Sequence, residues 1–162
     1  MYRRTFLATV PTLALAGCLR RLGLTEHVVV TEKWIEATEI DLDDGDGEER
    51  TLTLIRRLDA SDGPVFEDVH EDLEGRFGED EALVLEDDLQ RDLENEYLEL
   101  RLRARVCEDA PLGEPDGARG CEVVNIVRDD FNEVYVGDVI EVRSSGDGIG
   151  LLEVYERRED RE

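Results

Sequence analysis

The sequence predicts an α+β domain built on an antiparallel sheet of about six strands, with two helices inserted after the first hairpin. Residues 28–40 and 50–58 are rich in β-branched, aromatic and alternating apolar residues, as strands are. Residues 64–77 and 87–96 instead carry apolar residues at helical spacing. Because further strand-like segments follow the helices, antiparallel pairing is expected, as an open sheet or as a small open barrel.

The two helices are predicted from start signals and spacing. Residues 61–64, Ser-Asp-Gly-Pro, resemble a helix start, and Gly78 is expected to cap the first helix at its end. Apolar residues recur every fourth position in between: Val65, Val69, Leu73 and Phe77. The same spacing marks the second helix: Leu85, Leu89, Leu93 and Tyr97.

The strands after the second helix are expected at four places: residues 97–107, 121–128, 139–143 and 151–155. The first of these alternates apolar with charged side chains, as a half-exposed antiparallel strand does. A short helical turn is expected to begin at residues 129–131. The domain is therefore predicted to span residues 27–156, with residues 157–162 as a charged C-terminal tail.

The charge of the chain limits its partners and suggests its solvent. The 162 residues carry a net charge of -24, with 43 acidic residues against 19 basic ones, of which only Lys33 is a lysine. This charge argues against nucleic acid as a ligand, because phosphate binding needs a basic patch. The acids run along the whole chain, and their mutual repulsion is screened at molar salt. In this respect the composition resembles that of proteins from salt-loving archaea.

The N-terminus has the pattern of an export signal. Two arginines precede a mostly apolar stretch, residues 6–17, which is too short to cross a bilayer as a helix. Leu15-Ala16-Gly17-Cys18 resembles the lipobox of secreted lipoproteins. That resemblance implies cleavage after residues 1–17 and a lipid on Cys18, with residues 18–26 as a short tether.

The export route is suggested by the first residues. Arg3-Arg4-Thr5-Phe6-Leu7 resembles the core of a twin-arginine signal, although Tyr2 and Ala8 depart from the common pattern. The general secretory route is the alternative. Together the segments resemble a haloarchaeal-type lipoprotein, which implies attachment to the outer face of the cytoplasmic membrane. This resemblance covers residues 1–18 only.

Cys107 and Cys121 are predicted to form a disulfide. They flank a turn-rich loop at the ends of strands that are expected to be neighbours, and an exported protein meets an oxidising environment. Closing such a loop would contribute up to about 3 kcal/mol in the chain-entropy model. A metal or redox pair is the alternative, but the Cys-x-x-Cys spacing is missing.

The other candidate sites have ordinary structural explanations. His27 and His70 are too few for a zinc site, and the acidic turn 41–49 departs from a calcium-binding loop at Gly45. One basic stripe follows a strand face: Arg101, Arg103 and Arg105. Pairing with acids on neighbouring strands, for instance Glu122 or Glu141, is expected, with anion binding as the alternative.

No motif for catalysis, a cofactor or a metal stands out, so the expected function is non-catalytic binding or scaffolding at the cell surface. A cell-envelope hydrolase that uses carboxylates is one alternative, which two carboxyl groups converging in a pocket would reveal. An accessory subunit of a membrane complex is the other. It would show as an exposed apolar patch, for which Trp34 and Tyr135 are the first residues to inspect.

Overall fold

The computed structural model describes residues 25–41, 47–108, 120–145 and 148–161. These residues form one sheet with two α-helices, α2 (Asp87–Glu96) and α3 (Arg128–Glu133), and two 3-10 turns, η2 (Glu71–Leu73) and η3 (Arg158–Arg161). The strands are β1 (Thr25–Asp41), β2 (Glu48–Ala60), β3 (Gly63–Glu67), β4 (Glu99–Cys107), β5 (Glu122–Asn125), β6 (Val139–Ser145) and β7 (Gly148–Glu156). The α+β class is confirmed, but the described sheet has seven strands rather than about six.

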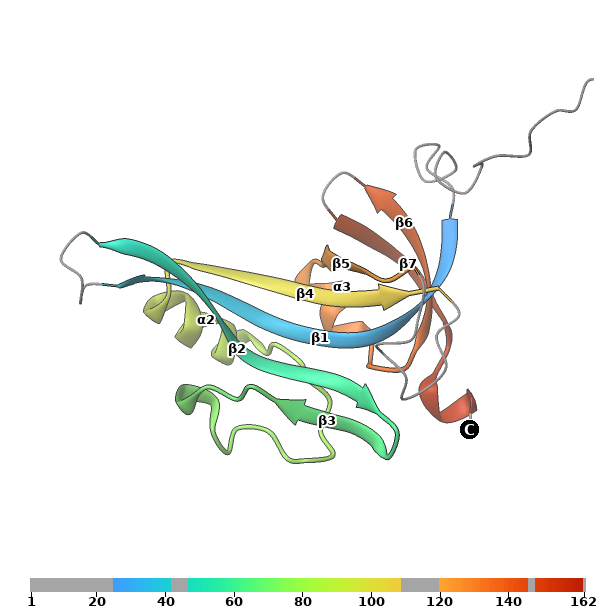
Figure 1. Cartoon of the computed structure of the whole chain (residues 1–162), viewed down its shortest axis with the longest axis horizontal. Coiled ribbons are helices and arrows are strands. Elements are labelled where there is room, and N and C mark those ends of the chain that lie inside the picture. The colour runs from blue at the N-terminus through green and yellow to red at the C-terminus, as the bar shows by residue number, and fades with distance from the viewer. Residues whose placement is uncertain (1–24, 42–46, 109–119, 146–147, 162) are drawn as a thin grey trace, which may run out of the picture.

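The sheet is organised around β1, in the order β3-β2-β1-β4-β5-β7-β6. The long strands β1, β2 and β4 run side by side, and β1 bends near its N-terminal end (Figure 1). Beyond the bend, residues 25–29 pair with β6, so the C-terminal part of the sheet curls back onto β1. The join between β5 and β7 is a single parallel pair, Asn125 with Gly148, and the sheet stays open.

The predicted first helix is wrong, because residues 63–67 form an edge strand instead. Phe66 pairs with Arg57 of β2, and a two-residue turn at Ser61 and Asp62 joins the two strands. Pro64 fits an edge strand, where a missing N–H on the solvent side breaks no ladder. The only helical structure between here and α2 is the single 3-10 turn η2. Two of the four apolar residues that suggested the helix, Leu73 and Phe77, instead lie in a loop and pack against the core.

The core lies between one face of the sheet and the helices. The second helix is confirmed at the predicted residues, and its buried Leu89 and Leu93 lie in the same cluster as Ala104 and Val106 of β4. The alternation in β4 is also confirmed, since its arginines point away from that cluster. Asn132 of α3 ties the loop before α2 in place by bonding both the N–H and the C=O of Leu85, at 2.7 and 3.0 Å.

A β-bulge in β1 decides which of its side chains enter the core. The register of β1 against β4 shifts between Val30 and Glu32. Before the shift, Val28 and Val30 face the core. A bulge inserts one residue, so the alternation of side chains between the two faces of the sheet shifts by one position. The buried residues after the bulge are therefore the odd-numbered Lys33, Ile35 and Ala37. The only lysine of the chain is therefore carried inward.

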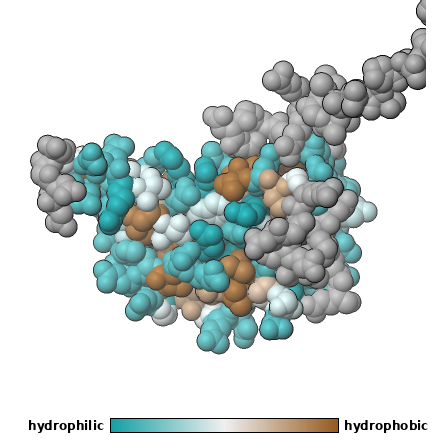
Figure 2. Space-filling view, in the orientation of Figure 1, coloured by the Kyte–Doolittle hydropathy of each residue, from teal (hydrophilic) through white to brown (hydrophobic). Residues whose placement is uncertain are grey.

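The predicted signal peptide and lipobox, and residues 18–24 of the predicted tether, lie outside the described residues. So do residues 42–46 of the acidic turn. Residues 25–26, also predicted as tether, instead belong to β1, because they pair with β6. In the described ranges, no helix is long and apolar enough to cross a membrane. Hydrophobic side chains appear in Figure 2 as separate patches among hydrophilic ones.

Candidate functional site: a charged cleft beside Lys33

A cleft of about 530 Å³ lies where β2, the segment before α2, the turn after α3 and the C-terminal residues meet. Four cationic residues line it: Lys33, Arg57, Arg157 and Arg158. Four acidic residues line it as well: Asp80, Glu81, Asp138 and Glu159. The whole chain has 43 acidic residues and 19 basic ones, so a cleft with equal numbers of both is richer in positive charge than the chain as a whole.

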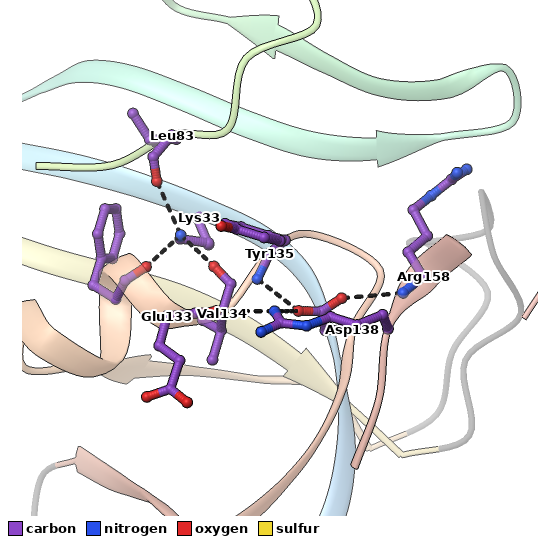
Figure 3. Close-up of polar contacts among 9 residues, drawn as sticks. Lys33, Leu83, Glu133, Val134, Tyr135, Asp138 and Arg158 are labelled. Carbon is purple, nitrogen blue, oxygen red and sulfur yellow. Dashed lines mark hydrogen bonds and ion pairs between the residues drawn. The ribbon is translucent and has the colours of Figure 1, made fainter. Parts of the chain in front are cut away.

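Lys33 forms the floor of the cleft, and its side chain is about 1% exposed. Its Nζ donates to three backbone carbonyls: Leu83 O at 3.0 Å, Phe131 O at 2.5 Å and Val134 O at 2.6 Å (Figure 3). The same Nζ lies 4.2 Å from the centroid of the Phe131 ring. Lys33 thus ties the loop before α2 to both the end of α3 and the residue after it.

The ionisation of Lys33 is set by two opposing effects. Burial lowers the pKa of Lys33 to about 7, and the negative charge of Asp138 acts in the opposite direction. The geometry favours the ammonium form, because three acceptors receive its three protons, whereas a neutral amine would turn its lone pair toward a carbonyl oxygen. In this protonated form the lysine links three segments of the chain and has no lone pair with which to attack a substrate.

Asp138 is the anionic counterpart of Lys33 and is also about 1% exposed. Its Oδ2 accepts from the Tyr135 N–H at 2.9 Å and from Arg157 Nη1 at 2.7 Å. Its Oδ1 accepts from the Arg158 N–H at 3.1 Å. Three donors therefore satisfy this carboxylate and fasten the C-terminal residues to the turn that precedes β6 (Figure 3).

The C-terminal arginines contact the body of the domain, which the sequence analysis did not foresee. Arg157 Nη1 also donates to Glu133 O at 2.9 Å, and its guanidinium lies 4.9 Å from the centroid of the Tyr135 ring. Arg158 Nε donates to Asp59 Oδ1 at 3.1 Å, and that carboxylate is 3% exposed. Residues 157 and 158 thus form one wall of the cleft.

Arg57 of β2 also lines the cleft and is about 5% exposed. Its guanidinium lies 4.2 Å from the centroid of the Phe66 ring, on the neighbouring strand β3. Nη1 donates to Glu79 O at 2.7 Å. The ring and the carbonyl together fix the plane and the direction of this guanidinium.

The predicted disulfide is present, with an S–S distance of 2.08 Å between Cys107 and Cys121. Cys107 is fully buried at the end of β4 and packs with Val29 in a small cluster of its own. The bond joins the end of β4 to the residue before β5, so it closes the connection between two paired strands.

The arginine stripe is neutralised on its own sheet face. Arg105 Nε lies 3.4 Å from Glu32 Oε1, Arg103 Nε lies 3.6 Å from Glu36 Oε2, and Arg101 donates twice to Glu99. Pairing with acids is confirmed, but Glu32 and Glu36 on β1 and Glu99 on β4 are not the partners named from the sequence. Each arginine of the stripe therefore already has a carboxylate within ion-pair distance.

Trp34 and Tyr135, the two residues proposed for an exposed apolar patch, differ in their exposure. Trp34 is 6% exposed, donates to Glu36 Oε1 at 2.8 Å and is covered by Arg56. Tyr135 is 43% exposed at the mouth of the cleft. An interaction patch at Trp34 is therefore not available, whereas Tyr135 belongs to the cleft.

The histidines lie apart, each with a local role. His27 of β1 stacks on Tyr155 at a centroid distance of 4.3 Å. His70 caps η2 by accepting from the Asp72 N–H at 3.4 Å. Among the described residues, no group of three or more histidine, cysteine or acidic side chains could hold a metal ion.

Of the residues that line the cleft, only Tyr135 was named from the sequence as a candidate interaction residue. One signal was present: the sole lysine stands within a segment of strand residues, three positions after Val30 and two before Ile35. Comparison with known proteins adds no relative, since no protein-family model, curated protein or solved structure matches the chain.

Proposed function

We propose that the chain is an exported, salt-adapted domain that binds a small ligand, without catalysis, in the cleft beside Lys33. The cleft of about 530 Å³ supports this proposal, because ligand sites typically enclose roughly 300–1,000 Å³ and contain a few convergent polar groups.

The observation that carries the proposal is that the charged groups at the cleft floor are fixed from inside the protein. Lys33 gives its three protons to carbonyls, and Asp138 accepts from three donors. The lining residues that the structure describes include no serine, threonine, cysteine or histidine. A fixed, charged floor without an available nucleophile suits recognition better than nucleophilic chemistry.

The ligand is sought directly in the native protein. We expect protein purified from its own membranes at molar salt to release a stoichiometric small molecule on denaturation, identified by liquid chromatography and mass spectrometry. Ala82→Trp should abolish this cargo by filling the cleft that Ala82 lines, whereas Val127→Trp, at a 63% exposed position, should keep it. Cargo that persists in Ala82→Trp would place the ligand elsewhere and contradict the proposal.

The location belongs to the same proposal. A lipid on Cys18, after export directed by Arg3, Arg4, Phe6 and Leu7, would hold the domain close to the outer face of the cytoplasmic membrane. Two acyl chains are expected, because one gives only marginal anchoring. The membrane contact is through this lipid, and an acidic surface of this kind would stay dispersed at molar salt.

Mass spectrometry of the membrane fraction tests the anchor. We expect a mature chain that starts at a lipidated Cys18, and Cys18→Ser should appear in the medium. The matched control, Cys107→Ser/Cys121→Ser, removes sulfur atoms elsewhere and should stay on the membrane. An unmodified Cys18 in a mature soluble chain would exclude the lipoprotein interpretation.

A cell-envelope hydrolase is the second candidate, and the acids of the cleft favour it. Asp80, Glu81 and Glu159 line the same space, as paired carboxylates do in glycoside hydrolases. Asp80→Asn and Glu159→Gln would then abolish hydrolysis of envelope polysaccharide while the thermal midpoint stays within a few degrees. Turnover of such a substrate by the unaltered protein would replace the binding proposal.

A further inference from the structure

Arg57 differs from the other cations of the cleft in its partners. Lys33 is saturated by carbonyls, and Arg157 and Arg158 each contact a carboxylate. The Arg57 guanidinium has five N–H donors, and Glu79 O is the one acceptor among the described residues. In the same part of the chain no carboxylate lies within ion-pair distance of it. Because a buried charge is costly without an opposite charge, Arg57 is suited to bind an anionic group of a ligand.

The geometry around Arg57 suits a carboxylate. Stacking on Phe66 and the bond to Glu79 O hold the guanidinium plane before any ligand arrives. The remaining donors form the planar fork that binds the two oxygens of a carboxylate. Because the side chain is already ordered, binding there loses little conformational entropy.

Asp80 supplies the opposite pole of the same cleft. It is exposed, it lines the cleft, and its negative charge is felt at Arg57 without an ion pair between the two. No described cationic side chain pairs with it. Glu81, the next residue, also lines the cleft. A separated cation and anion on one cleft are complementary to a ligand that carries both charges.

We infer that the cleft binds a small α-amino acid or a similar zwitterion, with its carboxylate on Arg57 and its ammonium facing Asp80. This inference rests on the proposed binding function and names the class of ligand. A purely anionic ligand would be repelled by Asp80 and Glu81, and a purely cationic one by Arg57. The exposed Tyr135 ring and Pro64 offer apolar surface to the ligand side chain.

The test uses the full lipidated protein in detergent at molar salt. The twenty amino acids are each titrated by thermal shift and by isothermal calorimetry, and we expect at least one to bind. The best binder is then compared with its analogue that lacks the amino group, its decarboxylated amine and inorganic phosphate. Each of these probes should bind at least tenfold more weakly, because it lacks one of the two charges.

Two variants locate the poles. Arg57→Gln should weaken binding of the amino acid at least tenfold, and so should Asp80→Asn, whose exposed position leaves the core untouched. The matched control is Arg76→Gln, which removes an exposed arginine paired with Asp92 at 3.0 Å and should leave the dissociation constant unchanged. Circular dichroism confirms that each variant is folded, and Asp80→Asn carries the test if Arg57→Gln does not fold.

The inference is overturned if no amino acid binds, if any of the three probes binds as well as the amino acid, or if either variant is folded and retains full affinity. That failure differs from failure of the proposed function. A different small molecule recovered from the native protein, and lost in Ala82→Trp, would leave the binding role standing while removing the zwitterion.

Discussion

The Nε atom of Arg158 lies 3.1 Å from Oδ1 of Asp59, a residue 99 positions earlier in the sequence. Asp59 is buried near the end of β2, and Arg158 begins η3. The pair ties the last turn of the chain to a strand formed near its start. It also places Arg158 at the wall of the cleft, so the stability and the shape of the candidate site depend on the same contact.

Breaking this pair is expected to destabilise the domain. Arg158→Gln removes the charged contact between Nε of residue 158 and the buried Asp59 carboxylate and should lower the free energy of unfolding by about 2 kcal/mol. A double-mutant cycle with Asp59→Asn in chemical denaturation at molar salt measures the coupling. A coupling energy near zero would mean that the contact does not contribute to stability.

The side chain of Arg158 passes close to the backbone at Gly137. Its φ is +92°, and a Cβ there would lie 2.5 Å from Cδ of Arg158. Gly137→Ala should therefore cost about 2 kcal/mol or more, from backbone strain and from displacement of Arg158.

Gly63→Ala is the matched control for that substitution. Its φ is also positive, +119°, but a Cβ there would meet nothing within 4 Å. Thermal unfolding of both variants separates strain from the clash, and Gly137→Ala should have the lower midpoint. Equal midpoints would show that Arg158 moves aside without loss.

The buried Lys33 should make stability depend on pH. Its pKa in the folded chain is about 7, against 10.5 in the unfolded chain, so between these values the unfolded state binds more protons. Stability should then rise with pH above 7, with a slope of up to about 1.4 kcal/mol per pH unit. Below pH 7 both states hold the proton and this dependence ends.

Chemical denaturation between pH 7 and 9.5 checks this slope. Lys33→Met removes the titrating group, so its free energy of unfolding should lack the rise, although the three carbonyls left unpaired lower its stability at every pH. Above pH 10 an opposite trend enters, because burial and the bond to Asp72 raise the pKa of Tyr97. A slope that persists in Lys33→Met would assign it to other groups.

The disulfide should contribute to stability rather than to chemistry. Cys107→Ala/Cys121→Ala is expected to lower the free energy of unfolding by up to about 3 kcal/mol, because the unfolded chain regains the freedom of a closed loop. Calorimetry of this variant with and without the candidate ligand checks both parts. A loss of ligand binding in a folded variant would contradict a purely structural role.

The elements that the sequence predicts well are those whose pattern is local. The α2 helix shows the leucine spacing of one buried face, and β4 alternates strictly between apolar and charged residues. The strand β3 was missed because Val65 and Val69 also fit a helical face, and pairing with β2 decided the outcome.

The cleft could not be predicted, because long-range geometry creates it. If side chains simply alternated along β1 from Val28 and Val30, Lys33 would lie on the face away from the core. The bulge between Val30 and Glu32 turns Lys33 to the core face, and that bulge is fixed by pairing with β4. Asp138 and Arg157 look like surface charges in the sequence. They meet only because the C-terminal residues fold back onto the turn before β6.

The burial of Lys33 has a practical consequence for chemical labelling. It is the only lysine of the chain, and its ammonium sits inside the core with its protons donated. Amine-directed reagents such as activated esters therefore find no side-chain target on the folded domain. Acylation at Lys33 would report the opening of the core, and cross-linking of neighbours in the native state has to proceed through carboxylates.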